Sequence, residues 1–203
     1  MSIHTFQTVL ISSLCSVFVL CGCTSTEPTA RTGFLSDYSQ LRQTSSTTLQ
    51  YVDGQQLEKY EAFIIEPVRF QLDSETDMLS RQDINNLSSY MHRRIVEAVI
   101  ASDHEVTHRA GPEVARIRAA ITDIDNTSAT IPVTSINGPG FKGAAIEAEI
   151  LDTYTGEQVS AVVDSQKSFR IPLTSINDWS ATKEAMDRWG EKLRKQLESD
   201  SEY

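Results

Sequence analysis

The best candidates for metal ligation are two histidines four residues apart, His104 and His108, with acidic residues beside the first. On a helix this spacing would place both imidazoles on one face, but Gly111-Pro112 and the β-like Glu105-Val-Thr argue against a helix. On a strand the two rings would lie about 13 Å apart along the backbone. No third ligand is evident, so we predict no metal site and no cofactor.

The sequence patterns for acid–base or nucleophilic chemistry are weak. There is no Gly-x-Ser-x-Gly elbow, and the His-Glu-x-x-His match at His104–His108 lies in the segment for which a helix is disfavoured. Asp123 and Asp125 share one face of a predicted strand, whereas glycosidase carboxylates face each other across a cleft. The glycine-rich segment 138–143 lacks the Gly-Lys-Ser/Thr ending that contacts phosphates. We therefore predict no catalytic residues and a protein that is not an enzyme, with an unrecognised hydrolase as the least favoured alternative.

The strongest chemical signal is a cysteine near the N-terminus. Residues 1–22 contain no Lys, Arg, Asp or Glu, and Val9–Leu20 is an apolar run broken only by serines, as in a secretory signal. The run ends in Leu20-Cys21-Gly22-Cys23, which resembles a lipobox, with an aliphatic residue three positions before the cut and a small one directly before it. This predicts a signal peptide over 1–22, cleavage between Gly22 and Cys23, and lipid on Cys23. The residues before the apolar run include no Lys or Arg, which departs from the usual pattern of a secretory signal. The alternative to a signal peptide is that this stretch forms a buried helix of a cytosolic domain.

Lipidation of Cys23 would decide where the protein lies. One acyl chain gives only marginal membrane binding, but bacterial lipoproteins that resemble this chain carry several on that cysteine. Thr24 follows Cys23, where the Gram-negative sorting pattern places Asp for retention in the inner membrane, so we predict the periplasmic face of the outer membrane. Cys15 and Cys21 would leave with the signal peptide, so no thiol would remain. The net charge of -10 disfavours electrostatic binding to nucleic acid and to anionic headgroups.

The remaining sequence predicts a tether over residues 23–32 and one α+β domain over 33–203. A segment with apolar residues, Gly33–Leu41, comes first, and the polar stretch Gln43–Gln50 is expected to be a loop. A strand follows within Tyr60–Phe70. Pro67 has no N–H to donate, so we expect either that the strand lies near a sheet edge or that Pro67 lies near the strand's own end. Apolar residues at steps of three and four predict a helix over Met78–Ser102, with Ser80 and Asp83 at capping spacing.

Three alternating segments predict further strands. They are Val114–Ile124, Ala144–Leu151 and Val159–Val163. Alternate residues are expected to share the face toward the core, as Val159, Ala161 and Val163 do in the last segment, and the charged residues to face solvent. Gly156 is expected at a left-handed position in the hairpin turn between the last two. On the solvent side, Arg116 and Arg118 would face Glu147 and Glu149.

A second helix is expected from about Ser180, with one buried stripe formed by Ala185, Trp189, Leu193 and Leu197. The predicted fold is therefore an antiparallel sheet of about four or five strands with two helices packed on one face.

One heptapeptide occurs twice, as Ile131–Asn137 and Ile171–Asn177, with six of seven positions identical. Each copy follows a strand of the same expected direction, so both should leave the sheet at one end. A chance similarity of two strand-exit loops is one explanation. The other is an apolar interaction rim, formed by Ile136, Asn137, Ile176 and Asn177, that contacts a protein partner or the lipid surface.

Four segments, Gly33–Leu41, Arg116–Thr122, Ile146–Glu157 and Met186–Leu193, are similar in sequence and order to a bacterial lipoprotein family, domain of unknown function thirty-three thirteen. The resemblance implies a single α+β domain on a lipid anchor and assigns no activity. We therefore expect a non-enzymatic outer-membrane lipoprotein that acts through contacts with an unidentified envelope protein. The alternative is a transport-accessory or small-ligand-binding lipoprotein, which a deep apolar pocket under the first helix would favour.

Overall fold

The computed structural model describes residues 31–72, 79–124, 142–168 and 179–199. The predicted signal peptide, Cys23 and both heptapeptide copies lie outside these ranges. The elements in chain order are β1 (Arg42–Gln43), β2 (Thr48–Val52), α1 (Gly54–Leu57), β3 (Ala62–Ile65), β4 (Arg69–Phe70), α2 (Arg81–Ala101), β5 (Glu105–Val106), β6 (Val114–Ile124), β7 (Lys142–Asp152), β8 (Gln158–Ser168) and α3 (Ser180–Ser199).

The described strands form one mixed sheet of eight strands, in the order β1-β2-β8-β7-β6-β3-β5, with β4 also paired to β6. The α+β class is confirmed, but the prediction of four or five purely antiparallel strands is wrong. The long strands β6, β7 and β8 are antiparallel neighbours, whereas β3 and β4 run parallel to β6. The parallel pairing follows from the connection, because α2 carries the chain across the sheet between β3 and β6.

Two predictions for the first half of the chain need correction. The supposed loop Gln43–Gln50 contains the end of β1 and the start of β2. The single strand expected within Tyr60–Phe70 is divided into β3 and β4 on either side of Pro67. Of the two placements expected from Pro67, the strand end is observed and the sheet edge is not, since β3 ends at Ile65 and β5 pairs with its outer side.

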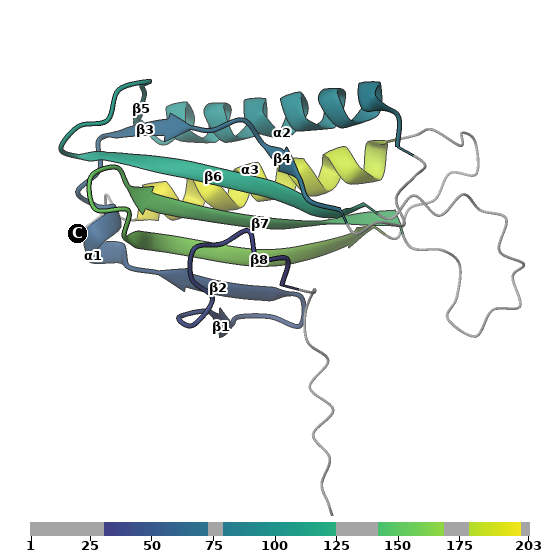
Figure 1. The fold of residues 1–203 in the computed structure, drawn as a ribbon, viewed down its shortest axis with the longest axis horizontal. Coiled ribbons are helices and arrows are strands. Elements are labelled where there is room, and N and C mark those ends of the chain that lie inside the picture. The colour runs from purple at the N-terminus through teal and green to yellow at the C-terminus, as the bar shows by residue number, and fades with distance from the viewer. Residues whose placement is uncertain (1–30, 73–78, 125–141, 169–178, 200–203) are drawn as a thin grey trace, which may run out of the picture.

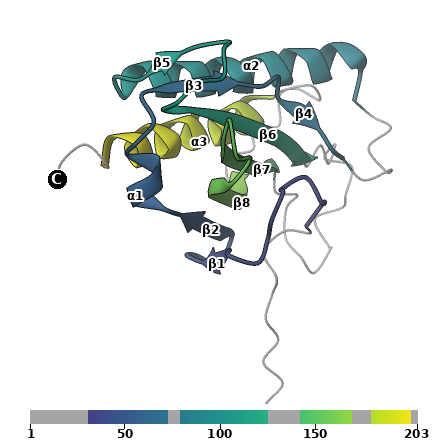
Figure 2. The same ribbon diagram turned by 60° about the vertical axis from the view of Figure 1, so that its left-hand side comes forward.

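The long helices α2 and α3 lie side by side on one face of the sheet (Figures 1 and 2), as predicted. Ser80 caps α2 by accepting a hydrogen bond from the Asp83 N–H. The expected stripe of α3 is confirmed, because Ala185, Trp189 and Leu197 are buried and Leu193 is partly buried. These side chains pack onto the residues of β6 and β7 that were predicted to face the core, among them Ile117, Ile121, Ile146 and Ile150.

Strand β8 departs from simple alternation. Ile150 pairs with Ser160 and Leu151 with Gln158, so Val159 is an extra residue in a β-bulge. Val159 points into the core under the helices, whereas Ala161 and Val163 are buried on the opposite face. The prediction that these three side chains share one face is therefore wrong, because one inserted residue reverses the phase of the strand.

The face opposite the helices is covered by the N-terminal segment, residues 32–41, here called the strap. Figure 1 shows it crossing β7 and β8 in dark purple. Phe34, Leu35 and Leu41 of the strap are buried with Ala161 and Val163 in a second apolar cluster. Both faces of the central strands are thus removed from water.

The strap is held down by two carboxylates that were expected to face solvent, Glu147 and Glu149. They are 0% and 1% exposed. The Thr32 N–H donates to Glu147 at 2.8 Å, and the Ser36 N–H and O–H donate to Glu149 at 2.8 and 2.7 Å. The predicted contact between Arg118 and Glu149 is present at 2.7 Å, but it is a pair with a fully buried carboxylate.

Arg116 does not face Glu147 or Glu149 as expected. Its guanidinium lies 3.6 Å from the carboxylate of Glu66 instead, because β3 and the turn after it lie beside β6.

Candidate functional site

The helix layer is narrower than the sheet. Helices pack about 8–10 Å apart and strands about 4.8 Å apart, so two helices cover about four strands. Helix α2 contacts β3, β4 and β5, and α3 contacts β7 and β8. Figure 2 shows β2 and β1 extending beyond α3. This leaves a hollow between α3 and the β2 edge of the sheet.

The hollow is a cavity of about 640 Å³, within the size range of ligand sites in proteins. Its interior is apolar and reaches from the β2 edge to α2. The apolar residues that line it are Val52, Met91, Ile95, Ile117, Ile146, Ala148, Ile150, Val162, Trp189 and Leu193. Only Met91 and Ile95 of the lining belong to α2, so this apolar pocket lies mainly beside α3 and not under the first long helix, where a pocket would favour a ligand-binding role.

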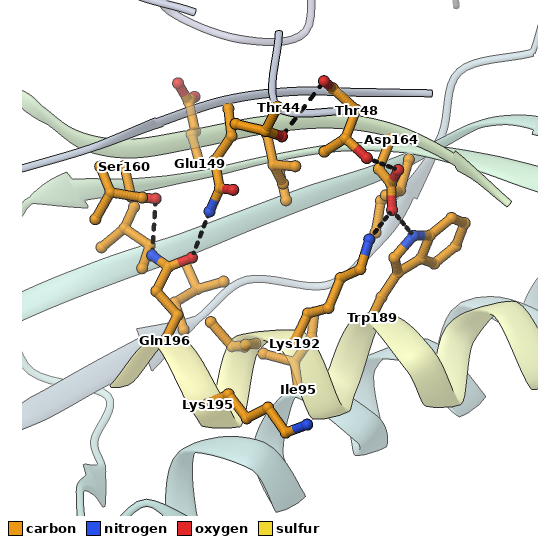
Figure 3. Close-up of a pocket in the computed structure, with 18 of the residues that line it drawn as sticks. Thr44, Thr48, Ile95, Glu149, Ser160, Asp164, Trp189, Lys192, Lys195 and Gln196 are labelled. Atoms are coloured by element: carbon orange, nitrogen blue, oxygen red, sulfur yellow. Dashed lines mark hydrogen bonds and ion pairs between the residues drawn. The ribbon is translucent and has the colours of Figure 1, made fainter. Parts of the chain in front are cut away.

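Polar side chains at the cavity are bonded mainly to one another. The Gln50 amide donates to Gln196 at 3.1 Å, and the Gln196 amide donates to the Ser160 hydroxyl at 3.0 Å. Figure 3 shows Gln196 reaching from α3 to Ser160, and Lys192 reaching from the same helix to Asp164. These bonds join α3 to β2 and β8 across the cavity and hold its walls apart at a fixed spacing.

The centre of this polar network is Asp164, which is 0% exposed. Its Oδ1 accepts a hydrogen bond from Thr48 at 2.6 Å. Its Oδ2 accepts from Gln166 at 2.7 Å, Lys192 at 2.8 Å and the Trp189 indole at 2.9 Å. Burial by itself raises the pKa of Asp164, but the hydrogen bonds from Lys192, Thr48 and Gln166 outweigh it and bring the pKa below the ordinary 3.8. Asp164 is therefore a buried, fully bonded anion.

The residues considered for metal or catalytic chemistry are not gathered here. Within the described ranges, no group of three or more His, Cys, Asp or Glu side chains is placed to hold a metal ion. His104 packs edge-on against Phe63, with ring centroids 5.3 Å apart, and its Nδ1 lies 3.1 Å from the Ser102 hydroxyl. No described His or Cys lines the cavity. The arrangement is suited to holding a molecule through apolar contact.

The residues singled out from the sequence are not those of the cavity. Gly22, Cys23, Ile136, Asn137, Ile176 and Asn177 all lie outside the described ranges. The two strands that precede the heptapeptide copies, β6 and β8, are both antiparallel to β7. They therefore end at the same end of the sheet, as expected. The cavity was missed because six elements contribute to it. The sequence feature that points to the cavity is a single acidic residue, Asp164, directly after a valine-rich strand segment.

In the described ranges, no helix combines the length and the hydropathy that a membrane span requires.

A family model described as "Protein of unknown function (DUF3313)" matches residues 30–193, and the chain belongs to this family. The resemblance inferred from the sequence is thereby confirmed. The curated relative "Uncharacterized lipoprotein YdcL" of Escherichia coli (strain K12) is 29% identical over 125 residues, which are 58% of this chain and 56% of the relative. The chain thus spans little more than half the length of that relative. The family is a bacterial lipoprotein family without an established function.

Among solved structures, the PelC dodecamer from Paraburkholderia phytofirmans is similar with a TM-score of 0.44 and 12% identity, over 75% of this chain and 96% of that one. A minor lipoprotein from Acinetobacter baumannii is similar with a TM-score of 0.40 and 8% identity, over 70% of this chain and 95% of that one.

Proposed function

We propose that this chain is a lipid-anchored lipoprotein of the periplasmic face of the outer membrane that binds a small apolar or amphipathic ligand and catalyses no reaction. The observation that carries the ligand-binding role is the cavity of about 640 Å³ beside α3. Its interior offers apolar surface, and its polar groups are already bonded to each other. A molecule enters such a site by displacing water from apolar walls, which is favourable without new hydrogen bonds.

The anchor is supported by the Leu20-Cys21-Gly22-Cys23 sequence and by the lipoprotein name of the curated relative. Nine peptide steps lead from Cys23 to Thr32, where the strap begins. A fully extended chain of that length spans about 30 Å. Because the strap is hydrogen-bonded to buried carboxylates of β7, the domain would be held close to the bilayer. Thr24 after the cysteine favours the outer membrane.

The anchor is tested by metabolic labelling with a clickable fatty acid in cells that produce the full chain. We expect label on the wild type and on Cys21→Ala, and none on Cys23→Ala. The Cys21→Ala variant is the matched control, since it removes a neighbouring thiol and keeps the predicted acceptor. Label that persists in Cys23→Ala, or is absent from the wild type, contradicts the anchor.

Ligand binding is tested with N-phenyl-1-naphthylamine, an uncharged dye that fluoresces in apolar sites. The protein is the chain from residue 23 with Cys23→Ser, which retains every described residue. We expect saturable binding that Val162→Trp weakens at least tenfold, because Val162 lines the cavity. Val106→Trp is the control, since Val106 is an exposed valine on β5, outside the cavity lining. Equal binding by the two variants contradicts a binding role for the cavity.

A second candidate role is contact with an envelope protein. It is favoured by the common direction of β6 and β8, after which the two heptapeptide copies follow. Replacing Ile136 and Ile176 together with Asp tests this role. If crosslinked partners in intact cells are unchanged by the double substitution, the rim does not mediate contact.

A further inference from the structure

Resting on the proposed ligand-binding role, we propose that the cavity takes a single-chain amphiphile, one acyl chain that carries an anionic headgroup. The apolar interior of the cavity determines which part of a ligand can enter it. Ile117, Ile146, Ile150 and Val162 form the sheet side, and Met91 and Ile95 close the far end. These side chains offer no hydrogen bond, so a buried sugar or base would leave polar groups unsatisfied, at a cost of several kcal/mol. A hydrocarbon chain leaves none.

The volume decides between one chain and two. A methylene group is similar in size to a water molecule, whose share of the liquid is about 30 Å³. A chain of about 16 carbons therefore needs roughly 480 Å³, and two such chains roughly 960 Å³. The cavity of about 640 Å³ holds the first and not the second. The flexible Met91 side chain at the far end can adapt to the end of a chain. The volume therefore favours one enclosed chain over two.

The charges at the cavity favour an anionic headgroup. Lys192 and Lys195 both line it from α3, and their side chains are 54% and 68% exposed. The charge of Lys192 is matched by Asp164 at 2.8 Å. Lys195 lies 3.6 Å from a Glu191 carboxylate that already receives closer bonds from Arg194, at 2.9 and 2.6 Å. Lys195 is therefore only loosely paired. Because its ammonium group has three N–H donors, it can also donate to a ligand headgroup.

The acidic side chains of the described lining do not oppose such a headgroup. Asp164 is paired with Lys192, and Glu149 is paired with Arg118 at 2.7 Å on the strap side of the sheet. A carboxylate or a phosphodiester near Lys195 would receive direct hydrogen bonds from its ammonium group, in place of the 3.6 Å contact to Glu191. The shared chemistry is one acyl chain with one anionic group, which a free fatty acid and a lysophospholipid both provide.

The test is displacement of N-phenyl-1-naphthylamine from the chain beginning at residue 23 with Cys23→Ser. The competitors are palmitate, lysophosphatidylglycerol, hexadecanol and dipalmitoylphosphatidylglycerol, all supplied at equal concentrations as complexes with methyl-β-cyclodextrin, and the carrier with dye alone is the blank. We expect the two anionic single-chain competitors to displace the dye, with the better of them identifying the headgroup. Hexadecanol should be about two- to fivefold weaker, the range for one solvent-exposed charge pair. The two-chain lipid should not displace the dye.

Substitution of Lys195 tests the charge. In Lys195→Gln the advantage of palmitate over hexadecanol should disappear, and high salt should reduce it in the wild type. Lys59→Gln is the matched control, since Lys59 bonds to Gln56 beside α1 and does not line the cavity. Both lysines are on the surface, so both variants are expected to fold, which circular dichroism verifies.

Equal displacement by hexadecanol and palmitate, or an equal effect of Lys59→Gln and Lys195→Gln, would contradict the anionic headgroup. Displacement by the two-chain lipid would contradict the single chain. In those cases dye binding that depends on Val162 still supports the proposed function. If the wild type binds the dye no better than Val162→Trp, the proposed ligand-binding role itself fails. Ala148→Leu on β7 is a second cavity-filling variant, in case Val162→Trp does not fold.

Discussion

Replacing Asp164 with Asn is the sharpest test of how the cavity walls are held. The substitution keeps the size of the side chain but removes its charge and one of its acceptor atoms. In the native protein four donors converge on the two carboxylate oxygens, from Thr48, Gln166, Trp189 and Lys192. An amide has one oxygen, and its NH₂ group would face donors. At least one buried donor must lose its partner.

The structure sets the size of the effect. Leaving a buried donor unsatisfied costs about 1–3 kcal/mol, and breaking a buried ion pair costs about 3–5 kcal/mol. Lys192 is half exposed and can turn into water, so the lower part of this range applies. We expect Asp164→Asn to lower the free energy of unfolding by about 3 kcal/mol. For a domain of this size that corresponds to a melting temperature lower by about 6–12 °C.

The effect should depend on pH with a definite sign. Because the pKa of Asp164 is lowered below 3.8 by folding, the native state is stabilised by the ionised carboxylate at every pH above the unfolded value. This stabilisation is lost as the pH falls through the folded pKa. The stability difference between wild type and Asp164→Asn should therefore be full at pH 6 and shrink below about pH 4.

Urea unfolding followed by circular dichroism between pH 3 and pH 7 measures both effects. Asp103→Asn is the control, because Asp103 is an exposed aspartate whose left-handed backbone, with a φ of 62°, suits asparagine as well. Its unfolding midpoint should match the wild type at neutral pH. If Asp164→Asn is as stable as this control, or if its deficit is the same at pH 3 and pH 7, the account of Asp164 as a buried bonded anion is refuted.

Two further predictions concern the strap and the β7–β8 hairpin. Glu149→Gln should release the strap, since Glu149 accepts from Ser36 and pairs with Arg118. Limited proteolysis should then cut within residues 32–41 faster than in the exposed control Glu157→Gln, and equal rates would contradict this role. Gly156→Ala should destabilise by about 1–2 kcal/mol because Gly156 has a φ of +72°. Gly111→Ala, whose φ is not positive, should change the thermal unfolding midpoint much less, and equal shifts would show that the hairpin geometry is not decisive.

Several features follow from residues that are close together in the sequence, and these could be predicted. The bounds of β6 match the predicted Val114–Ile124, because strict alternation of side chains is itself the signal of a strand with one face on the core. Capping by Ser80 and the left-handed Gly156 were also predictable, since both depend on the backbone within three or four residues. The lipid acceptor Cys23 belongs to the same kind of local inference and remains a prediction.

Features that depend on distant parts of the chain were not predictable. Glu147 and Glu149 have the pattern of a solvent-facing strand edge, yet they are buried because a strap more than 100 residues earlier in the sequence covers them. The bulge at Val159 could not be predicted for a similar reason. A residue is recognised as extra only when its strand is compared with the partner strand, here β7. The parallel pairing of β3 with β6 depends on where α2 brings the chain back to the sheet.

By itself, then, the sequence determined the two long helices, the long strands and the turn, because local geometry and periodicity specify each of them. The lipid anchor is a prediction of the same local kind. Only the tertiary structure decided the order of the strands, the burial of the two glutamates and the existence of the cavity. A cavity is the space left where two helices cover fewer strands than the sheet contains, and no single segment carries that information. The Asp164 network has the same origin, because its five side chains come from β2, β8 and α3 and become neighbours only on folding.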